Sequence, residues 1–345
     1  MEELHDSGAD SGSAEHRDDG MLLQATGLSD LDRRIIQALQ LDGRVSYTTL
    51  GPQLGTTEKV VRARVQNLLS SGVIDITVVT RPEALGYRFV AIVGIRVVGG
   101  GRDAIVEKLS RLGNVDYLVT TLGRYGILVE ILTRTLAELG DLVDREIAPL
   151  EGVARVDVYP YLDLRHQQGV FGRPSVVSDD RASAGGRDPL ELDEIDAAIL
   201  QRLNANGRAP FLAIGRELGL PEAKVRRRVG RMRARGAVQI MAITNPMSLG
   251  FDVVALIGIT VQPGSRAIDV ADRLSAVAAV SYVAVCTGGF DLFVEAVCRG
   301  TDDFLRVMDD ELRATPGVAS LEPFLYLGLR YRRVSPLAAA EDSGA

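Results

Sequence analysis

The chain has 345 residues, of which 46% are hydrophobic and 25% are charged, and its formal net charge is −7. These values are typical of a globular protein with two or more domains, and they argue against a uniformly basic nucleic-acid-binding protein. No apolar run approaches the roughly 20 residues that a membrane-spanning helix needs, and the N-terminus does not resemble a signal peptide. The sequence therefore predicts a cytoplasmic protein with no membrane partner.

Charge is distributed unevenly along the chain. Residues 1–20 contain seven acidic side chains against one arginine, among serine and glycine, which predicts a disordered acidic tail over residues 1–27. Residues 28–75 contain six basic and five acidic residues, a net charge of +1, whereas residues 192–239 contain ten and five, a net charge of +5. Because duplex DNA attracts clustered basic charge, residues 192–239 have the electrostatic footprint of a DNA-binding domain.

One sequence unit occurs twice. Residues 31–97 align without gaps with residues 195–261 at an offset of 164, and 25 of the 67 positions are identical. After one inserted residue the match resumes at an offset of 165 and continues to Arg165 and Arg330. The chain therefore contains two copies of a unit of about 140 residues, and an internal repeat of this kind determines the whole interpretation of the fold.

The first part of each copy has helical periodicity. In the second copy, seven basic side chains fall in the twelve residues from Lys224 to Arg235. Val225, Val229 and Met232 recur there at i, i+4 and i+7, which predicts one apolar stripe on a helix whose other faces are basic. The preceding residues 217–221 combine a helix end, a glycine and a proline. This pattern indicates a helix-turn-helix, and a solvated charged helix is the alternative.

The second part of each copy has the order βαββαβ, which is typical of a ferredoxin-like fold. In the first copy the expected segments are 89–97, 102–112, 115–121, 126–132, 135–146 and 153–164. In the second copy they are 252–261, 266–277, 280–287, 291–297, 301–312 and 318–330. The fold class is therefore α+β, with helix-turn-helix domains at 28–75 and 190–239, ferredoxin-like domains at 76–165 and 240–334, a linker at 166–189 and a tail at 335–345.

Both copies resemble the Lrp/AsnC family of bacterial and archaeal transcription regulators. The resemblance rests on Leu31-Asp32-x-x-Ile35-Ile36, Leu54-Gly55 and Val61-x-x-Arg64-Val65, on the equivalents Ile195-Asp196-x-x-Ile199-Leu200, Leu218-Gly219 and Val225-x-x-Arg228-Val229, and on a Pro-x-x-Leu-Gly at 82–86 and 246–250.

The resemblance implies a winged or three-helix DNA-binding domain followed by a RAM/ACT-like βαββαβ domain that dimerises, assembles further and senses a small effector, commonly an amino acid. We hypothesise that one chain imitates the family's dimer, with its two sheets face to face, and that such pseudo-dimeric chains form homo-oligomers. Two DNA-reading helices would then lie about 34 Å apart, one helical turn of duplex DNA.

The candidate DNA contacts lie on and around the second helix of each helix-turn-helix. Residues near the start of that helix reach base edges, and later arginines reach phosphates. For Arg44 and Arg208, which follow a glycine between helices, phosphate contact and helix capping are both open. The outer face is less basic in the first copy, so that reader is expected to be weaker or dependent on DNA shape. The candidates are Arg44, Thr56, Thr57, Glu58, Arg62 and Arg64, and Arg208, Pro221, Glu222, Lys224, Arg227, Arg228 and Arg231.

The candidate ligand site is the glycine turn between the second and third strands of the ferredoxin-like domain. It resembles the family's Gly-x-(Tyr/Phe)-Asp turn, in which backbone N–H groups can hold a carboxylate and an aspartate can hold an ammonium group. An ordinary hairpin is the alternative. Gly126 replaces the aspartate in the first copy, so a ligand is expected in the second copy or between both. The candidates are Thr287, Gly288, Gly289, Phe290 and Asp291, and Gly123, Arg124 and Tyr125.

Catalytic chemistry has no visible basis in the sequence. All three histidines, His5, His16 and His166, fall in the expected tail or linker, so no folded domain has one as a base or metal ligand. No P-loop, dinucleotide fingerprint or nucleophile elbow occurs. We therefore expect no enzyme, no cofactor and no metal. One alternative is an assembly or ligand-sensing protein with degenerate helix-turn-helix domains. Another is an amino-acid-metabolism enzyme with a regulatory βαββαβ module, for which the sequence supplies no catalytic residues.

Overall fold

The computed structural model describes residues 28–80, 86–167, 190, 192–244 and 246–331. The expected tails at 1–27 and 335–345 lie outside these ranges. Of the expected linker at 166–189, only residues 166 and 167 lie within them. No helix within the described ranges is both long enough and apolar enough to cross a bilayer.

Each copy begins with three helices. They are α2 (Asp30–Leu41), α3 (Tyr47–Gln53) and α4 (Glu58–Ser70) in the first copy, and α8 (Glu194–Ala205), α9 (Phe211–Leu218) and α10 (Glu222–Ala234) in the second. Capping boxes, in which the N-cap and N3 residues bond to each other's backbone, start α2 at Ser29 and α8 at Asp193. Gly219 ends α9 in the left-handed conformation, as the sequence predicts for the turn before α10.

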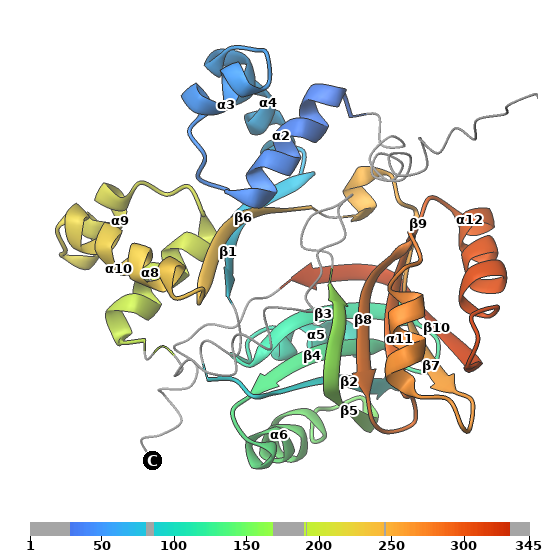
Figure 1. Ribbon diagram of the computed structural model, residues 1–345. Helices are drawn as coiled ribbons and strands as arrows, with labels where there is room; N and C mark the ends of the chain where they lie inside the picture. The colour runs from blue at the N-terminus through green and yellow to red at the C-terminus, as the bar shows by residue number, and fades with distance from the viewer. Residues whose placement is uncertain (1–27, 81–85, 168–189, 191, 245, 332–345) are drawn as a thin grey trace, which may run out of the picture.

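A short two-stranded ribbon joins the copies next to these helices. Its strands are β1 (Ile74–Thr80) and β6 (Val238–Thr244), which pair antiparallel from Ile74 opposite Thr244 to Thr80 opposite Val238. Local sequence patterns do not predict this ribbon. In Figure 1 it runs between the two groups of helices, so the two helix-turn-helix domains form one body.

The ferredoxin-like modules follow the predicted order of elements. The first consists of β2 (Phe89–Val97), α5 (Arg102–Leu109), β3 (Val115–Leu122), β4 (Ile127–Thr133), α6 (Leu136–Leu142) with the π-helix η2 (Val143–Ile147), and β5 (Val153–Gln167). The second consists of β7 (Val253–Val261), α11 (Ala267–Leu274), β8 (Val280–Cys286), β9 (Leu292–Cys298), α12 (Thr301–Arg306) with η4 (Val307–Leu312), and β10 (Val318–Tyr331).

The two sheets close into one barrel in the order β10-β3-β4-β2-β5-β8-β9-β7. They are joined at two seams, where β5 pairs with β8 and β10 pairs with β3. One face of each sheet packs on its own helices, in clusters that include Ile95 with Ile105 and Ile257 with Val270. The other faces meet inside the barrel (Figure 1). Closure leaves neither sheet with an unpaired edge strand at the seams.

Strand β5 continues past the expected end of the first module at residue 165. His166 pairs in register with Val283 of β8, and its side chain is only 6% exposed. The assignment of His166 to the linker is therefore wrong. The composition becomes loop-like at this point, but the strand is extended by pairing with the other copy.

Each seam contains a carboxylate that accepts hydrogen bonds from two tyrosines, one on each joined strand. Glu130 Oε2 accepts from the Tyr161 hydroxyl at 2.6 Å and from the Tyr282 hydroxyl at 2.8 Å. At the other seam, Glu295 Oε2 accepts from Tyr326 at 2.7 Å and from Tyr117 at 2.8 Å. These two triplets connect the copies through side chains, at the same seams where the paired strands connect them through backbone hydrogen bonds.

The Glu130 triplet makes a pH-dependent contribution to stability. Burial, and then the negative charge of Asp116, raises the pKa of Glu130 from 4.5 to about 7, with a smaller contribution from Glu295. A carboxyl whose pKa is raised by folding contributes stability that is present below its unfolded pKa and lost as the pH rises through its folded pKa. The contribution from Glu130 therefore falls between about pH 4.5 and about pH 7.

We predict that Glu130→Gln, which keeps a hydrogen-bond acceptor without the charge, flattens the decrease in melting temperature between pH 5 and pH 8. Thermal unfolding followed by circular dichroism across this range measures it. Glu107→Gln, which neutralises an exposed carboxylate on α5, controls for the loss of one charge. An identical pH profile for Glu130→Gln and the wild type would contradict the role of this carboxylate.

Candidate nucleic-acid interface

Two arginines cross between the helix-turn-helix domains. Arg44 Nη1 donates to the carbonyl oxygens of Gly207 at 2.7 Å and Ala209 at 3.0 Å. Reciprocally, Arg208 donates to Gly43 at 2.7 Å and Val45 at 3.1 Å. Each arginine therefore binds the backbone of the turn that carries the other.

An aromatic ring lies under each crossing arginine. The Arg44 guanidinium lies 4.2 Å from the ring centroid of Phe211, and that of Arg208 lies 4.1 Å from the ring of Tyr47. Tyr47 and Phe211 occupy equivalent positions at the starts of α3 and α9. The planar guanidinium can bond at its edge and stack on its face at once, which a lysine ammonium cannot do.

The turns themselves approach the ribbon too closely for any side chain. The N–H of Gly43 donates to Ile240 of β6 at 2.8 Å, and the N–H of Gly207 donates to Ile76 of β1 at 2.7 Å. A Cβ at Gly43 would lie 2.9 Å from the backbone of Met241, and one at Gly207 would lie 2.7 Å from the carbonyl oxygen of Ile76. The Gly-Arg pair in each copy thus docks each helix-turn-helix on the strand of the other copy.

These contacts bear on the two roles left open for Arg44 and Arg208. Their guanidinium groups bond carbonyls across the domain interface, and neither caps a helix of its own copy. Burial lowers the pKa of both, and for Arg44 the nearby charge of Arg208 lowers it further. The structure therefore places these two residues between the domains, where their contribution is to domain geometry.

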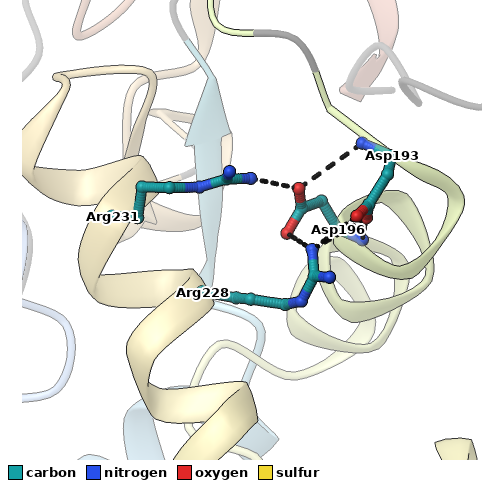
Figure 2. Close-up of polar contacts among 4 residues, drawn as sticks. All are labelled: Asp193, Asp196, Arg228 and Arg231. Carbon is teal, nitrogen blue, oxygen red and sulfur yellow. Dashed lines mark hydrogen bonds and ion pairs between the residues drawn. The ribbon is translucent and has the colours of Figure 1, made fainter.

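Helix α10 is fastened to α8 by a buried carboxylate (Figure 2). Asp196 is fully buried, and its Oδ1 accepts from Arg228 Nη1 at 2.8 Å, while Arg231 bonds its Oδ2. Arg228 also bonds Asp193, the N-cap of α8, at 2.7 Å. The hydrogen bonds to Asp196 and then Asp193 raise the pKa of Arg228. Two arginines expected to face DNA are thus held against the domain.

The equivalent contact in the first copy is simpler. Asp32, which is 7% exposed, accepts from Arg64 Nη1 at 3.1 Å. Asn67 stands where the second copy has Arg231, and Ser29 stands where it has Asp193. The helix α4 is therefore held by one arginine, where α10 is held by two.

The other predicted DNA contacts lie along the starts and outer faces of α4 and α10. Thr57 is the N-cap of α4, the Thr56 N–H bonds Gly51, and Pro221 is the N-cap of α10. Glu58 pairs with Arg62 at 2.6 Å, and Glu222 pairs with Arg226. Lys224 and Arg227 have no ion pair among the described residues, and Arg227 is exposed. Among the basic residues of α10 predicted to contact DNA, these two are left without a carboxylate partner there.

The predicted ligand turns lie at the contact between modules. Tyr125 is buried, and its hydroxyl donates to Asp157 at 2.9 Å and contacts that of Tyr159 at 2.5 Å. Phe290, also buried, lies 5.6 Å from Tyr159 between ring centroids. Each of these two rings therefore belongs to the core, and only the rest of its turn can meet a ligand.

The remaining turn residues differ between the copies. Thr287, Gly288 and Gly289 are exposed, as are Gly123 and Arg124. Arg124 pairs with Glu322 of the other module at 2.5 Å. Asp291 Oδ2 accepts the N–H of Val261 at 2.8 Å, so one of its oxygens closes the end of β7. Gly126 provides no such acceptor in the first copy. Among the described residues, no group of histidine, cysteine or acidic side chains could hold a metal ion.

Family models match most of the chain. The model of the AsnC-type helix-turn-helix domain matches residues 28–69 and 192–233, and that of the Lrp/AsnC ligand binding domain matches residues 90–168 and 254–332. The chain is 35% identical over 127 residues to the HTH-type transcriptional regulator FL11 of Pyrococcus furiosus, covering 36% of this chain and 83% of that protein. It is 34% identical over 122 residues to Ptr1 of Methanocaldococcus jannaschii, covering 35% and 82%.

The tandem arrangement also occurs in a solved structure. The siroheme decarboxylase NirDL covers 91% of this chain and 98% of its own with a TM-score of 0.61 at 14% identity, which shows a shared fold. The prediction that the chain is not an enzyme is contradicted, because a siroheme decarboxylase shares this fold. Its premise is wrong as well, since His166 lies in the barrel, where its Nε2 has no hydrogen-bond partner among the described residues.

We predict that Asp196→Ala loosens α10 more than Asp32→Ala loosens α4. Removing one partner of a buried ion pair leaves the other uncompensated, and we expect a local cost of about 2–3 kcal/mol for Asp196, or about 30- to 150-fold faster amide exchange. Hydrogen exchange followed by mass spectrometry measures both helices in each variant. Both substitutions remove a capping box, so the pair is matched. Equal acceleration in α4 and α10 would contradict the stronger fastening of α10.

Proposed function

Because the chain belongs to the Lrp/AsnC family, we propose that it is a sequence-specific regulator of transcription that binds duplex DNA through both helix-turn-helix domains. The observation that carries this proposal is the basic outer face of α10 within a domain pair joined by Arg44 and Arg208. A rigid pair of reading helices suits two neighbouring major-groove segments on one side of the duplex.

On α10, we assign the first turn to base edges and the cations to phosphates. Pro221 and Glu222 lie at the start of the helix, the part that enters the groove first in a helix-turn-helix. Lys224 and Arg227 follow and have no ion pair among the described residues. Contacts to phosphate supply affinity and register, whereas contacts to base edges supply sequence preference.

We also propose that a small effector with an amino-acid-like carboxylate and ammonium pair modulates DNA binding. Family membership of the two ligand-binding domains supports this, together with the exposed glycine turn at Thr287, Gly288 and Gly289. The full assembly would be a homo-oligomer of pseudo-dimeric chains. Calorimetric titration with free amino acids, followed by DNA binding in the presence of any that bind, tests the effector.

A second candidate function is enzymatic, on the same tandem scaffold. The whole-chain likeness to siroheme decarboxylase NirDL and the buried, unpartnered Nε2 of His166 within the described barrel support it. Incubation of the purified protein with siroheme, followed by mass spectrometry for loss of carbon dioxide, tests it. No turnover would leave the DNA-binding proposal as the one to pursue.

We predict that the full-length protein binds duplex DNA with an affinity that falls steeply with salt, and that Lys224→Ala/Arg227→Ala reduces the slope of log affinity against log salt by about 2. The reason is that each cation that neutralises a phosphate releases about one counterion. Fluorescence anisotropy at several salt concentrations measures the slope.

A suitable control for this experiment is Arg111→Ala/Arg313→Ala, which removes two exposed cations from the ferredoxin-like modules, away from α10. We expect it to keep the wild-type slope. If the wild type ignores duplex DNA in dilute buffer, the helix-turn-helix domains are degenerate and the proposal fails.

A further inference from the structure

The two reading helices of one chain present different surfaces. Both bury an equivalent apolar stripe, but five of the seven cations of α10 and its C-cap have uncharged counterparts in and after α4. Two of the replacements, Val60 and Leu69, are apolar side chains that are each 38% exposed. The replaced pairs are Lys224 with Val60, Arg227 with Ala63, Arg231 with Asn67, Arg233 with Leu69 and Arg235 with Ser71.

The cations that α4 shares with α10 are already paired within their own domain. Arg62 pairs with Glu58 at 2.6 Å, and Arg64 pairs with Asp32 at 3.1 Å. Their counterparts Arg226 and Arg228 are paired in the same way. Lys224 and Arg227, which have no ion pair among the described residues, are therefore among those that α4 lacks. In the other direction, α4 has Lys59, also without an ion pair there, where α10 has Ala223.

The two helices are held in fixed positions relative to each other. Reciprocal bonds from Arg44 and Arg208, together with the β1–β6 ribbon, join the two domains into one body. In a homodimer, symmetry makes two such readers identical. Here the sequence makes them different, so the two orientations of this body on a duplex are not equivalent.

We propose that this protein binds a non-palindromic duplex site in one orientation, with α10 on a half-site that supplies most of the electrostatic affinity and α4 on a weaker, less charge-dependent half-site. The inference rests on the proposed function, because it assumes that both helices face DNA. In physical terms, one half-site contributes more of the binding free energy than the other, so the bound chain has one preferred orientation on the duplex.

Selection from a pool of random duplexes by the full-length protein tests this orientation. We expect the selected sequences to share one unequal pair of half-sites without two-fold symmetry. A palindromic consensus with equally constrained halves would overturn the proposal. Recovery of no enriched sequence, together with no binding to the random pool in dilute buffer, would instead overturn the proposed function itself and this inference with it.

Matched variants then assign each half-site to its helix. On the selected duplex, Lys224→Ala/Arg227→Ala should lower affinity at least about tenfold more than Lys59→Ala/Arg62→Ala, which removes two cations from α4, and should reduce the salt slope by about 2. Equal losses for the two variants would overturn the assignment. Circular dichroism spectra and melting curves identify any variant that has lost its fold.

A gain-of-charge variant makes the test independent of lost contacts. Val60→Lys/Ala63→Arg gives α4 counterparts of Lys224 and Arg227, the two cations of α10 that have no ion pair among the described residues. We expect it to increase the salt slope by about 2 and to bind more tightly to a duplex carrying two copies of the α10 half-site as an inverted repeat. No increase in slope, with a wild-type melting curve, would overturn the unequal division between the helices.

Discussion

The relative position of the two helix-turn-helix domains depends on two arginines, each of which binds the other copy. Arg44 and Arg208 each bind carbonyl groups in the turn of the other copy and stack on an aromatic ring there. A guanidinium satisfies two acceptors in fixed directions while its face remains free for stacking, so the contact specifies an angle as well as a distance. Together with the glycine turns that dock on the β1–β6 ribbon, it sets where α4 and α10 lie. The positions of both candidate reading helices follow from this contact.

The barrel also joins the two copies through reciprocal contacts, here between whole sheets. A single ferredoxin-like sheet has edge strands with unpaired backbone groups, and exposed edges of this kind promote association with other chains. Here β5 pairs with β8, and β3 pairs with β10, so each sheet closes the edges of the other. The carboxylates of Glu130 and Glu295 add a tyrosine pair at each seam. Covalent linkage of the copies makes this closure independent of protein concentration, while their separate sequences allow the two halves to differ.

Local sequence patterns predicted the helices and strands well, but they could not predict the contacts between the two copies. The alternation in residues 89–97 predicted β2, and the stripe of Val225, Val229 and Met232 predicted the buried face of α10. The β1–β6 ribbon was missed because its two strands begin 164 residues apart in the sequence and no turn signal connects them. His166 was assigned to the linker for the same reason, since its strand is defined by β8.

The candidate site was predicted at the level of helices but not of individual arginines. The sequence identified α10 as basic, yet burial of Asp196 decides that Arg228 and Arg231 turn toward the domain. The acidic position that pairs with them is visible in the sequence as part of a capping pattern, which gives no sign of its second role. The exclusion of enzymes failed because the absence of familiar motifs says little about what a tandem fold of this type can catalyse.

The distance between the two reading helices is the most direct test of this account. Spin labels at Lys59→Cys and Ala223→Cys occupy equivalent exposed positions on α4 and α10, and the native Cys286 and Cys298 are buried. Pulsed electron paramagnetic resonance should give one narrow distance distribution, which broadens when Arg44→Ala/Arg208→Ala is added. A broad distribution in the protein with both arginines, or a narrow one that survives their removal, would contradict the claim that these arginines hold the two helices in register.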